Sequence, residues 1–205
     1  MKIRHVLLMS MLGMSLLMGG CARPPAEQIG AAEQAVKEAQ QSGAANYVAN
    51  DYAKVEGLLA AMKTEVAEQD GKFALFRDYG KAEQLAATTK AEAERVKADA
   101  GKKMEEAKFT AIQAQQAAQA AVASAQELVA KAPAGKDRAA LESIKTDAEA
   151  LKASLNDVQM LVDKADYLAA QTKAKAIHDK ADAVSHEIET ALAKIGKGKA
   201  LAKKK

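Results

Sequence analysis

The residue with the most distinctive chemistry in this sequence is Cys21, the only thiol among 205 residues. It cannot form a disulfide within the chain, and an unpaired thiol is unusual in an exported protein. It follows two cations, Lys2 and Arg4, an apolar stretch over 6–18, and the small residues Gly19–Gly20. This order is typical of an export signal with a small-residue cleavage site. The apolar stretch is shorter than the roughly 20 residues of a membrane-spanning helix, so the sequence predicts a removable signal peptide.

The five residues Leu17–Cys21 resemble the lipobox of bacterial lipoproteins. The resemblance implies that the thiol is diacylated, that residues 1–20 are removed, and that the freed amine takes a third acyl chain. Several acyl chains, at about 0.8 kcal/mol for each buried methylene, make a stable anchor. Ala22 follows in place of the aspartate that retains many lipoproteins in the inner membrane, which implies an outer-membrane location facing the periplasm. The alternative interpretation is an ordinary cleaved signal with an incidental cysteine.

A second group of residues has the spacing of a metal site. His178, Asp182 and His186 recur at intervals of four residues, which places them on one side of a helix, where they could chelate Zn²⁺ or Cu²⁺. No cysteine and no histidine from a second helix can complete a tetrahedral ligand set, so we predict no metal site and no cofactor. The sequence also has no Ser-His-Asp or Cys-His grouping and no glycine-rich phosphate loop. We therefore predict that the protein is not an enzyme.

The C-terminal stretch over 196–205 contains five lysines and no acidic residue, which predicts a flexible cationic tail. In the bacterial envelope, the available polyanions are peptidoglycan and lipid phosphates, and nucleic acid is absent. The chain resembles the murein lipoproteins, which are lipidated helical proteins whose C-terminal lysine is joined through its side-chain amine to peptidoglycan. The resemblance makes Lys205 a candidate for covalent attachment. The alternative is a solubilising, frayed chain end.

The elements that carry these residues are predicted to be helices, because alanine is abundant and only three prolines interrupt the chain. Pro24–Pro25 predict an extended tether over 21–25, between the lipid and the first helix. Apolar residues at three- and four-residue spacings predict a helix over 26–41, which stops at Gly43. A second helix follows, and together they form a short predicted hairpin over 26–71.

A long antiparallel coiled-coil hairpin is predicted over 72–195, with its turn at 132–136. The seam of its first arm is made of Ala107, Ala111, Ala114, Ala118, Ala121, Ala125, Leu128 and Ala132. The seam of its second arm continues with Leu141, Ile144, Ala148, Leu151, Leu155, Val158, Val162, Ala165, Ala169 and Thr172. A shift of register beyond Ala176 has the form of a coiled-coil stutter. The fold class is therefore predicted to be all-α, although the alanine spacing can also reflect helix propensity alone.

Five of the seven phenylalanines and tyrosines lie between positions 47 and 79, where we expect a compact core. They are Tyr47, Tyr52, Phe73, Phe76 and Tyr79. Proline, alanine, glycine and aromatic spacings over residues 25–125 resemble the alanine-rich envelope lipoproteins of the domain of unknown function 4398 family. The positions concerned are Pro24–Glu27, Ala32, Ala39, Gly43, Ala44, Tyr47, Tyr52, Gly71–Phe73, Tyr79, Ala82, Leu85 and Ala86. The resemblance implies an envelope setting and supplies no catalytic residues.

These observations predict a non-enzymatic envelope lipoprotein that acts as a structural spacer or tether between the outer membrane and the cell wall. Its predicted partners are the membrane, through the N-terminal lipid, and either peptidoglycan or an envelope protein. The alternative is an adaptor or chaperone-like subunit of an envelope complex, which grips partner helices with exposed apolar residues between Tyr47 and Tyr79. The sequence leaves the oligomeric state open, since an alanine-rich seam can be covered within one chain or by a second copy.

Overall fold

The computed structural model describes residues 23–132 and 138–202, and within these ranges its secondary structure is helical, without any β-strand. The predicted all-α class is therefore confirmed. No helix in the described part of the chain has an apolar segment long enough to cross a membrane. The chain divides into two compact units, described separately below: unit 1 ends at Gly101 and unit 2 begins at Lys102. Predicted features outside the described residues are the signal over 1–20, Cys21, most of the turn at 132–136, and Lys205.

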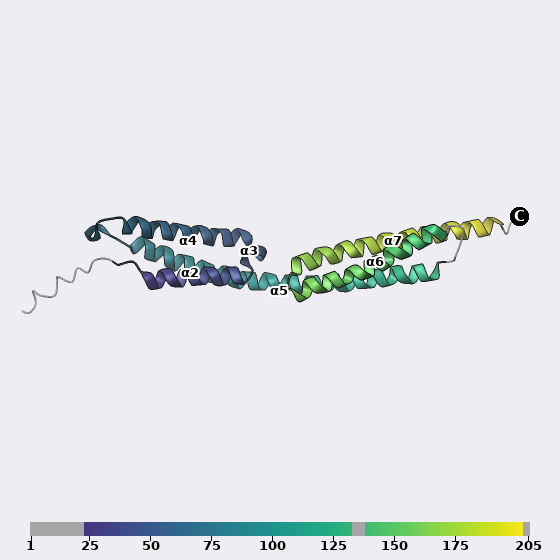
Figure 1. Cartoon of the computed structure of the whole chain (residues 1–205), viewed down its shortest axis with the longest axis horizontal. Coiled ribbons are helices and arrows are strands. Elements are labelled where there is room, and N and C mark those ends of the chain that lie inside the picture. Colours follow the sequence, from purple (N-terminus) through teal and green to yellow (C-terminus); the bar gives the residue numbers. More distant parts are fainter. Residues whose placement is uncertain (1–22, 133–137, 203–205) are drawn as a thin grey trace, which may run out of the picture. The chain divides into compact units, whose positions relative to one another are not determined.

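Unit 1 is a packed group of three main helices with a short helix between the first two (Figure 1). The helices are α2 (Ala26–Gln41), α3 (Ala44–Tyr47), α4 (Ala49–Asp70) and the first part of α5 (Gly80–Lys131). Helices α2 and α4 occupy the predicted hairpin over 26–71. The first part of α5 joins them, because Val96 and Ala100 are buried in one cluster with Val36 and Val55. The boundary between the units accordingly falls after residue 101 instead of at the predicted position 71.

The end of α2 is fixed by a glycine, as predicted. Gly43 has φ +82°, in the left-handed region that a residue with a side chain rarely adopts. A Cβ atom at this position would lie 3.1 Å from the Tyr47 ring. The Ser42 hydroxyl donates a hydrogen bond to the Ala39 carbonyl oxygen at 2.6 Å, which satisfies one of the last free carbonyls of α2. Both the backbone conformation and the close approach of Tyr47 therefore favour glycine here.

Unit 2 contains the second part of α5, α6 (Arg138–Asp163) and α7 (Tyr167–Ala202). The prediction of one continuous helical arm after the turn is wrong, because the chain reverses over 164–166 and α7 packs back along α6. The Gln115 amide donates to Gln159 Oε1 at 2.8 Å, which joins α5 to α6. Lys173 Nζ lies 2.5 Å from Asp157 Oδ2, which joins α7 to α6. The predicted two-armed hairpin over 72–195 is thus replaced by a three-helix unit.

The reversal between α6 and α7 is a Schellman motif closed by an alanine. The Asp166 N–H donates to the Leu161 carbonyl, and the Ala165 N–H donates to the Val162 carbonyl, both at 2.9 Å. Ala165 takes the left-handed position of the motif, with φ +58°. Asp166 then caps α7, because its Oδ1 accepts a hydrogen bond from the Ala169 N–H at 3.3 Å. Since the motif has no glycine, sequence inspection could not locate the turn.

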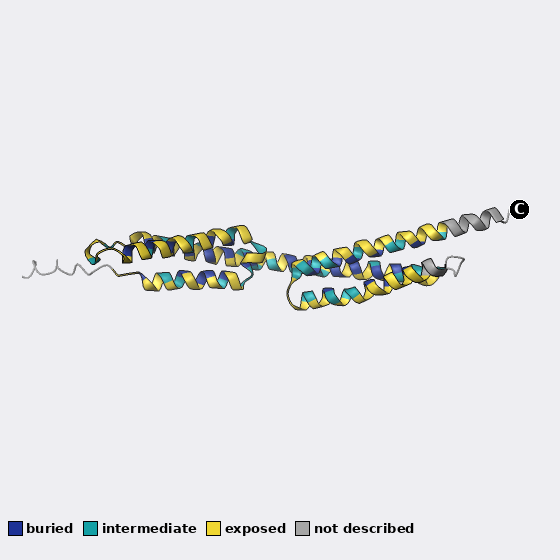
Figure 2. Ribbon diagram, turned by 45° about the horizontal axis from the view of Figure 1, so that its top comes forward, coloured by how far each residue is buried: buried dark blue, intermediate teal, exposed yellow. Residues whose placement is uncertain are grey.

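The predicted seams face the core up to this reversal. Every seam position of α5 from Ala107 to Leu128 is buried or half-buried, as are Ala132 just after α5 and the seam positions of α6 from Ile144 to Val162. The predicted seam fails at Ala165 and Thr172, which are exposed, because the phase of the pattern changes at the turn instead of beyond Ala176. The buried stripe of α7, visible among the dark blue positions of Figure 2, includes Ala170, Ala174, Ile177, Ala181 and Ile188.

The last helix extends further than the sequence indicates. Helix α7 continues to Ala202, so the prediction of a flexible tail over 196–205 is wrong for residues 196–202. Alanine and leucine at 200–202 are strong helix formers.

Candidate functional site

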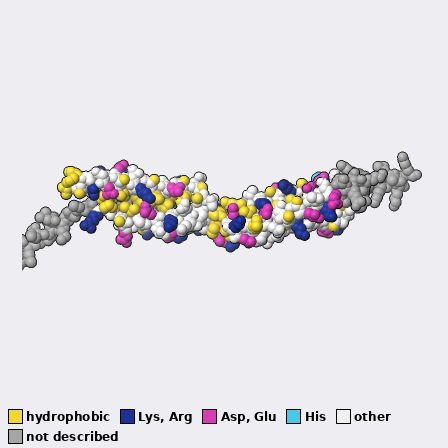
Figure 3. Space-filling view, viewed as in Figure 1, with side chains coloured by type: hydrophobic (Ala, Val, Ile, Leu, Met, Phe, Trp, Pro, Cys, Tyr) yellow, Lys and Arg dark blue, Asp and Glu magenta, His cyan; other side chains and the backbone are white. Residues whose placement is uncertain are grey.

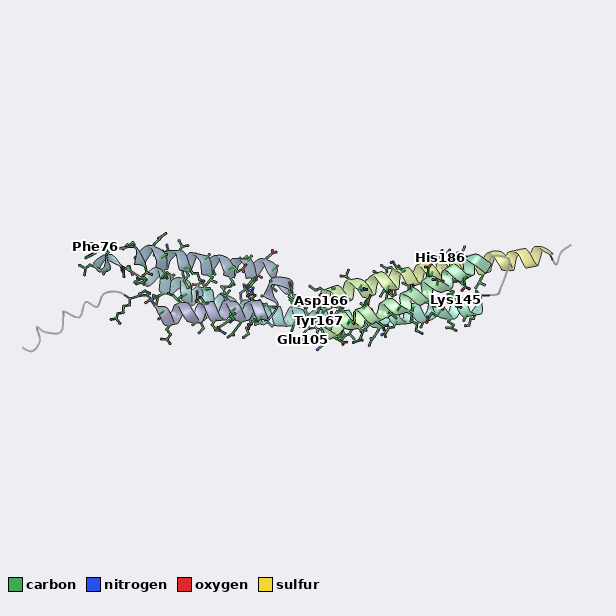
Figure 4. All side chains as sticks on the ribbon, viewed as in Figure 1. Phe76, Glu105, Lys145, Asp166, Tyr167 and His186 are labelled. Atoms are coloured by element: carbon green, nitrogen blue, oxygen red, sulfur yellow. The ribbon has the colours of Figure 1, made fainter. Side chains whose placement is uncertain are left out.

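The connection from α4 to α5 exposes the largest group of apolar side chains close together in unit 1. A 3₁₀ turn, η1 (Ala74–Phe76), bulges between the two helices. Phe73, Leu75 and Phe76, here named the apolar tip, are 70%, 76% and 74% exposed. The two phenylalanine rings lie 6.3 Å apart between centroids, within the range of a favourable aromatic pair. Figure 3 shows hydrophobic side chains gathered at this end of the unit, and Figure 4 labels Phe76 there.

An arginine fixes the backbone on both sides of the apolar tip. Arg77 Nε donates to the Lys72 carbonyl oxygen at 3.0 Å, and Arg77 Nη2 donates to the Asp70 carbonyl oxygen at 2.8 Å. The Phe76 N–H donates to the Phe73 carbonyl oxygen at 2.8 Å and closes the 3₁₀ turn. The connection is therefore held by hydrogen bonds at its start, centre and end, although its three apolar side chains point into solvent.

A buried polar network lies beneath the connection. Gln69 is 6% exposed, and its Oε1 accepts hydrogen bonds from the Asp78 N–H at 3.1 Å and from Lys72 Nζ at 2.9 Å. Its Nε2 donates to Glu65 Oε1 at 2.7 Å, and Glu65 Oε2 lies 2.5 Å from Lys81 Nζ. The hydrogen bonds from Lys81 and then from Gln69 hold the pKa of the Glu65 carboxyl below its ordinary value of 4.5. The Gln69 side chain thus joins α4 to the connection, and the Glu65 side chain joins α4 to α5.

Tyr79 anchors the end of the connection in the core. Its side chain is 3% exposed, and its hydroxyl donates a short hydrogen bond to the Asp70 carboxylate. This hydrogen bond, together with burial, raises the pKa of the Tyr79 phenol above its ordinary value. Asp78 Oδ1 accepts a hydrogen bond from the Gly80 N–H at 2.9 Å, at the first residue of α5. These hydrogen bonds therefore hold the connection that carries the apolar tip in a defined conformation.

The expected aromatic core is only partly present. Tyr52 and Tyr79 are buried, at 6% and 3% exposure, so they agree with the expectation. Phe73 and Phe76 contradict it, because the chain leaves α4 at Gly71 and carries them away from the helical faces that pack together. A signal for this was present in the sequence: these residues follow the helix interruption at Asp70–Gly71 and lie between Lys72 and Arg77.

The three residues considered for a metal site all lie on α7. His178 Nδ1 is 3.4 Å from Asp182 Oδ2 and 3.7 Å from Asp179 Oδ1, and His186 is exposed further along the helix (Figure 4). Among the described residues, no three histidine, cysteine, aspartate or glutamate side chains are arranged to hold a metal ion. His178 also lines a shallow depression of about 360 Å³ between α5 and α7. Its other lining residues are Thr110, Gln113, Ala114, Ala117, Gln171, Lys175 and Asp179.

Comparisons of this chain with family models, with curated proteins and with solved structures find no match. Its relation to the domain of unknown function 4398 family stays a prediction from the residues quoted above. The candidate site is therefore defined by its own geometry: a hydrogen-bonded connection that presents three large apolar side chains to solvent.

Proposed function

We propose that this protein is a non-enzymatic lipoprotein of the bacterial outer membrane and that it serves as a structural spacer or tether between that membrane and the cell wall. The observation that carries the proposal is the export signal that ends in the pattern Leu17–Cys21, followed at Ala26 by the first of a series of helices. A chain with this order has its acyl chains a few residues from a folded helical unit, which is the arrangement that a membrane-anchored spacer needs.

The way the helices pack supports a structural role. Ala111, Ala118 and Ala181 are fully buried, and alanine adds little buried area for each residue. Such residues let helix axes approach closely, so the chain is used for helix length instead of for a thick core. Helix α7 alone has 36 residues, which correspond to about 54 Å at 1.5 Å for each residue.

The first experiment reads both modified ends of the protein in one measurement. The protein is extracted from cell envelopes with and without muramidase treatment, and its peptides are weighed by mass spectrometry. The proposal expects acyl chains on the peptide that starts at Cys21, and a muropeptide mass on the peptide that contains Lys205 if the wall attachment is covalent. An unmodified Cys21 thiol in the envelope-extracted protein would contradict the lipoprotein assignment.

A second candidate function is an adaptor subunit of an envelope complex, and one observation in unit 2 favours it. Phe109, Met160 and Leu168 are 63%, 52% and 43% exposed, on α5, α6 and α7 respectively. Large exposed apolar side chains are the usual anchors of a protein partner. The positions of Met160 and Leu168 on either side of the reversal place two of them at one end of the unit.

Photocrosslinking in intact cells distinguishes the two candidate functions. A photoreactive amino acid is placed at Phe109, and a matched control is placed at Ser124, an exposed position of the same helix. Capture of one protein in stoichiometric amount at position 109, without capture at 124, would favour the adaptor. Capture of sugar polymer alone, or equal capture at both positions, would leave the spacer as the better explanation.

A further inference from the structure

The apolar tip lies at the end of unit 1 where α2 begins. Ala32 near the start of α2, Met62 in the second half of α4 and Ala86 near the start of α5 are buried in one cluster. Lys63 Nζ also lies 2.9 Å from Glu33 Oε1, and this ion pair links α4 to α2 beside the same cluster. Figure 1 accordingly shows the start of α2 beside the connection from α4 to α5.

The chain ahead of α2 is short enough to keep the lipid-bearing cysteine near the tip. Cys21 precedes Ala26 by five residues, which span at most about 18 Å when fully extended. From the level of the shared cluster, the start of α2 is about 9 Å away and the end of α4 is about 12 Å away, both in the same direction. An anchor at Cys21 therefore places the membrane surface within reach of Phe73, Leu75 and Phe76.

We propose that the apolar tip inserts into the same lipid leaflet that holds the acyl chains of Cys21. This inference rests on the proposed function, because it requires the lipidated cysteine. Phenylalanine and leucine side chains enter the headgroup and upper acyl region readily. The tip consists of three protruding side chains on a backbone held by hydrogen bonds. Such a group can insert into a lipid surface.

Two attachments at one end of unit 1 have a definite consequence. Acyl chains on a short tether alone allow the unit to tilt freely about Cys21. A second contact through the tip restricts the tilt, because the start of α2 and the α4–α5 connection are then both held at the bilayer surface. The tip thereby orients the helices of unit 1 with respect to the membrane.

The test uses the full chain, made with its own signal in a bacterial host and reconstituted into vesicles of phosphatidylethanolamine and phosphatidylglycerol. Leu75→Cys provides a thiol in the tip for an environment-sensitive fluorophore. Ala45→Cys provides the control, at an exposed position of α3 beyond the other end of α4. The parent chain is treated with the same reagent, because acylated Cys21 takes no label. Labelling of the parent at Cys21 would mean failure of the proposed function, independently of the tip.

The expected result is a blue shift of the emission at position 75 and a severalfold stronger quenching by spin-labelled lipids there than at position 45. Adding Phe73→Ser and Phe76→Ser to the Leu75→Cys chain is expected to abolish this difference, while circular dichroism confirms that the helices are retained. Equal quenching at positions 75 and 45 in an acylated protein would overturn the inference. A blue shift without lipid quenching would also overturn it, since the tip would then be covered by protein.

Discussion

The backbone of Ala165 determines where unit 2 folds back on itself. An alanine with φ +58° brings its Cβ close to the following carbonyl oxygen, which costs roughly 1–2 kcal/mol relative to a right-handed conformation. The Schellman hydrogen bonds on either side and the cap from Asp166 offset this cost. The reversal is thus held by its neighbours, and its central residue is the least favourable part of it.

Ala165→Gly is expected to stabilise unit 2 by about 1 kcal/mol, because glycine adopts the left-handed region without the Cβ clash. The free energy of unfolding in urea measures this change. The control is Ala153→Gly at an exposed position within α6, which is expected to destabilise the protein by about 1 kcal/mol. If a continuous helix passed through position 165, both substitutions would be destabilising.

Glu65 is expected to make the stability of unit 1 depend on pH in the acid range. Its pKa is lowered in the folded state by the hydrogen bonds from Lys81 and Gln69. The stabilisation is therefore fully present above the unfolded pKa, and it is lost as the pH falls through the folded pKa. Glu65→Gln is expected to reduce the loss of stability on acidification below about pH 4.5.

The measurement for this prediction is urea unfolding at a series of pH values between about 3 and about 7. Glu68→Gln removes an exposed carboxyl from the same helix and serves as the matched control. The same pH dependence in Glu65→Gln and in the wild-type protein would contradict a role for the Glu65 network.

The helices of unit 2 pack against one another through small side chains, so the distance between the helix axes depends on side-chain size. Ala118→Leu places a larger side chain at a fully buried seam position of α5 and is expected to cost about 1–3 kcal/mol through overpacking. Ala120→Leu, two residues further along at an exposed position, is expected to change stability by less than about 0.5 kcal/mol. Thermal unfolding of the two variants compares them directly, and equal effects would mean that the seam is not a packed interface.

The end of a helix can be predicted from the sequence only where a residue type typical of helix ends is present. The stop at Gly43 could be predicted because a left-handed residue after a helix is usually glycine. The reversal at Ala165 could not, because alanine there continues the helical pattern and its conformation depends on tertiary packing. The exposure of Phe76 was also missed, since an aromatic residue is expected in the core unless its position outside a helix is taken into account.

Each of the two units has its own hydrophobic core, formed by its own part of the chain. The core of unit 1 lies within the residues up to Gly101, and that of unit 2 lies after it. Met62 is fully buried in unit 1, so Met62→Ala is expected to cost about 2–5 kcal/mol through the cavity that it leaves. Hydrogen exchange is expected to accelerate in α2 and α4 and to remain unchanged in α6. A uniform acceleration in both units would show that they unfold together.

Helix α5 belongs to both units, which sets an order of folding as the chain emerges from its N-terminus. Every core residue of unit 1 has emerged by position 101, at roughly half of the chain. The first part of α5 can then pack against α2 and α4, while its second part waits for α6 and α7. The surface left uncovered during that interval is the alanine seam from Ala107 to Ala125. Alanine has the smallest apolar side-chain area of the residues in this seam, so it gains little free energy from non-specific burial. The emerging chain therefore exposes little that would favour aggregation before its partner helices emerge.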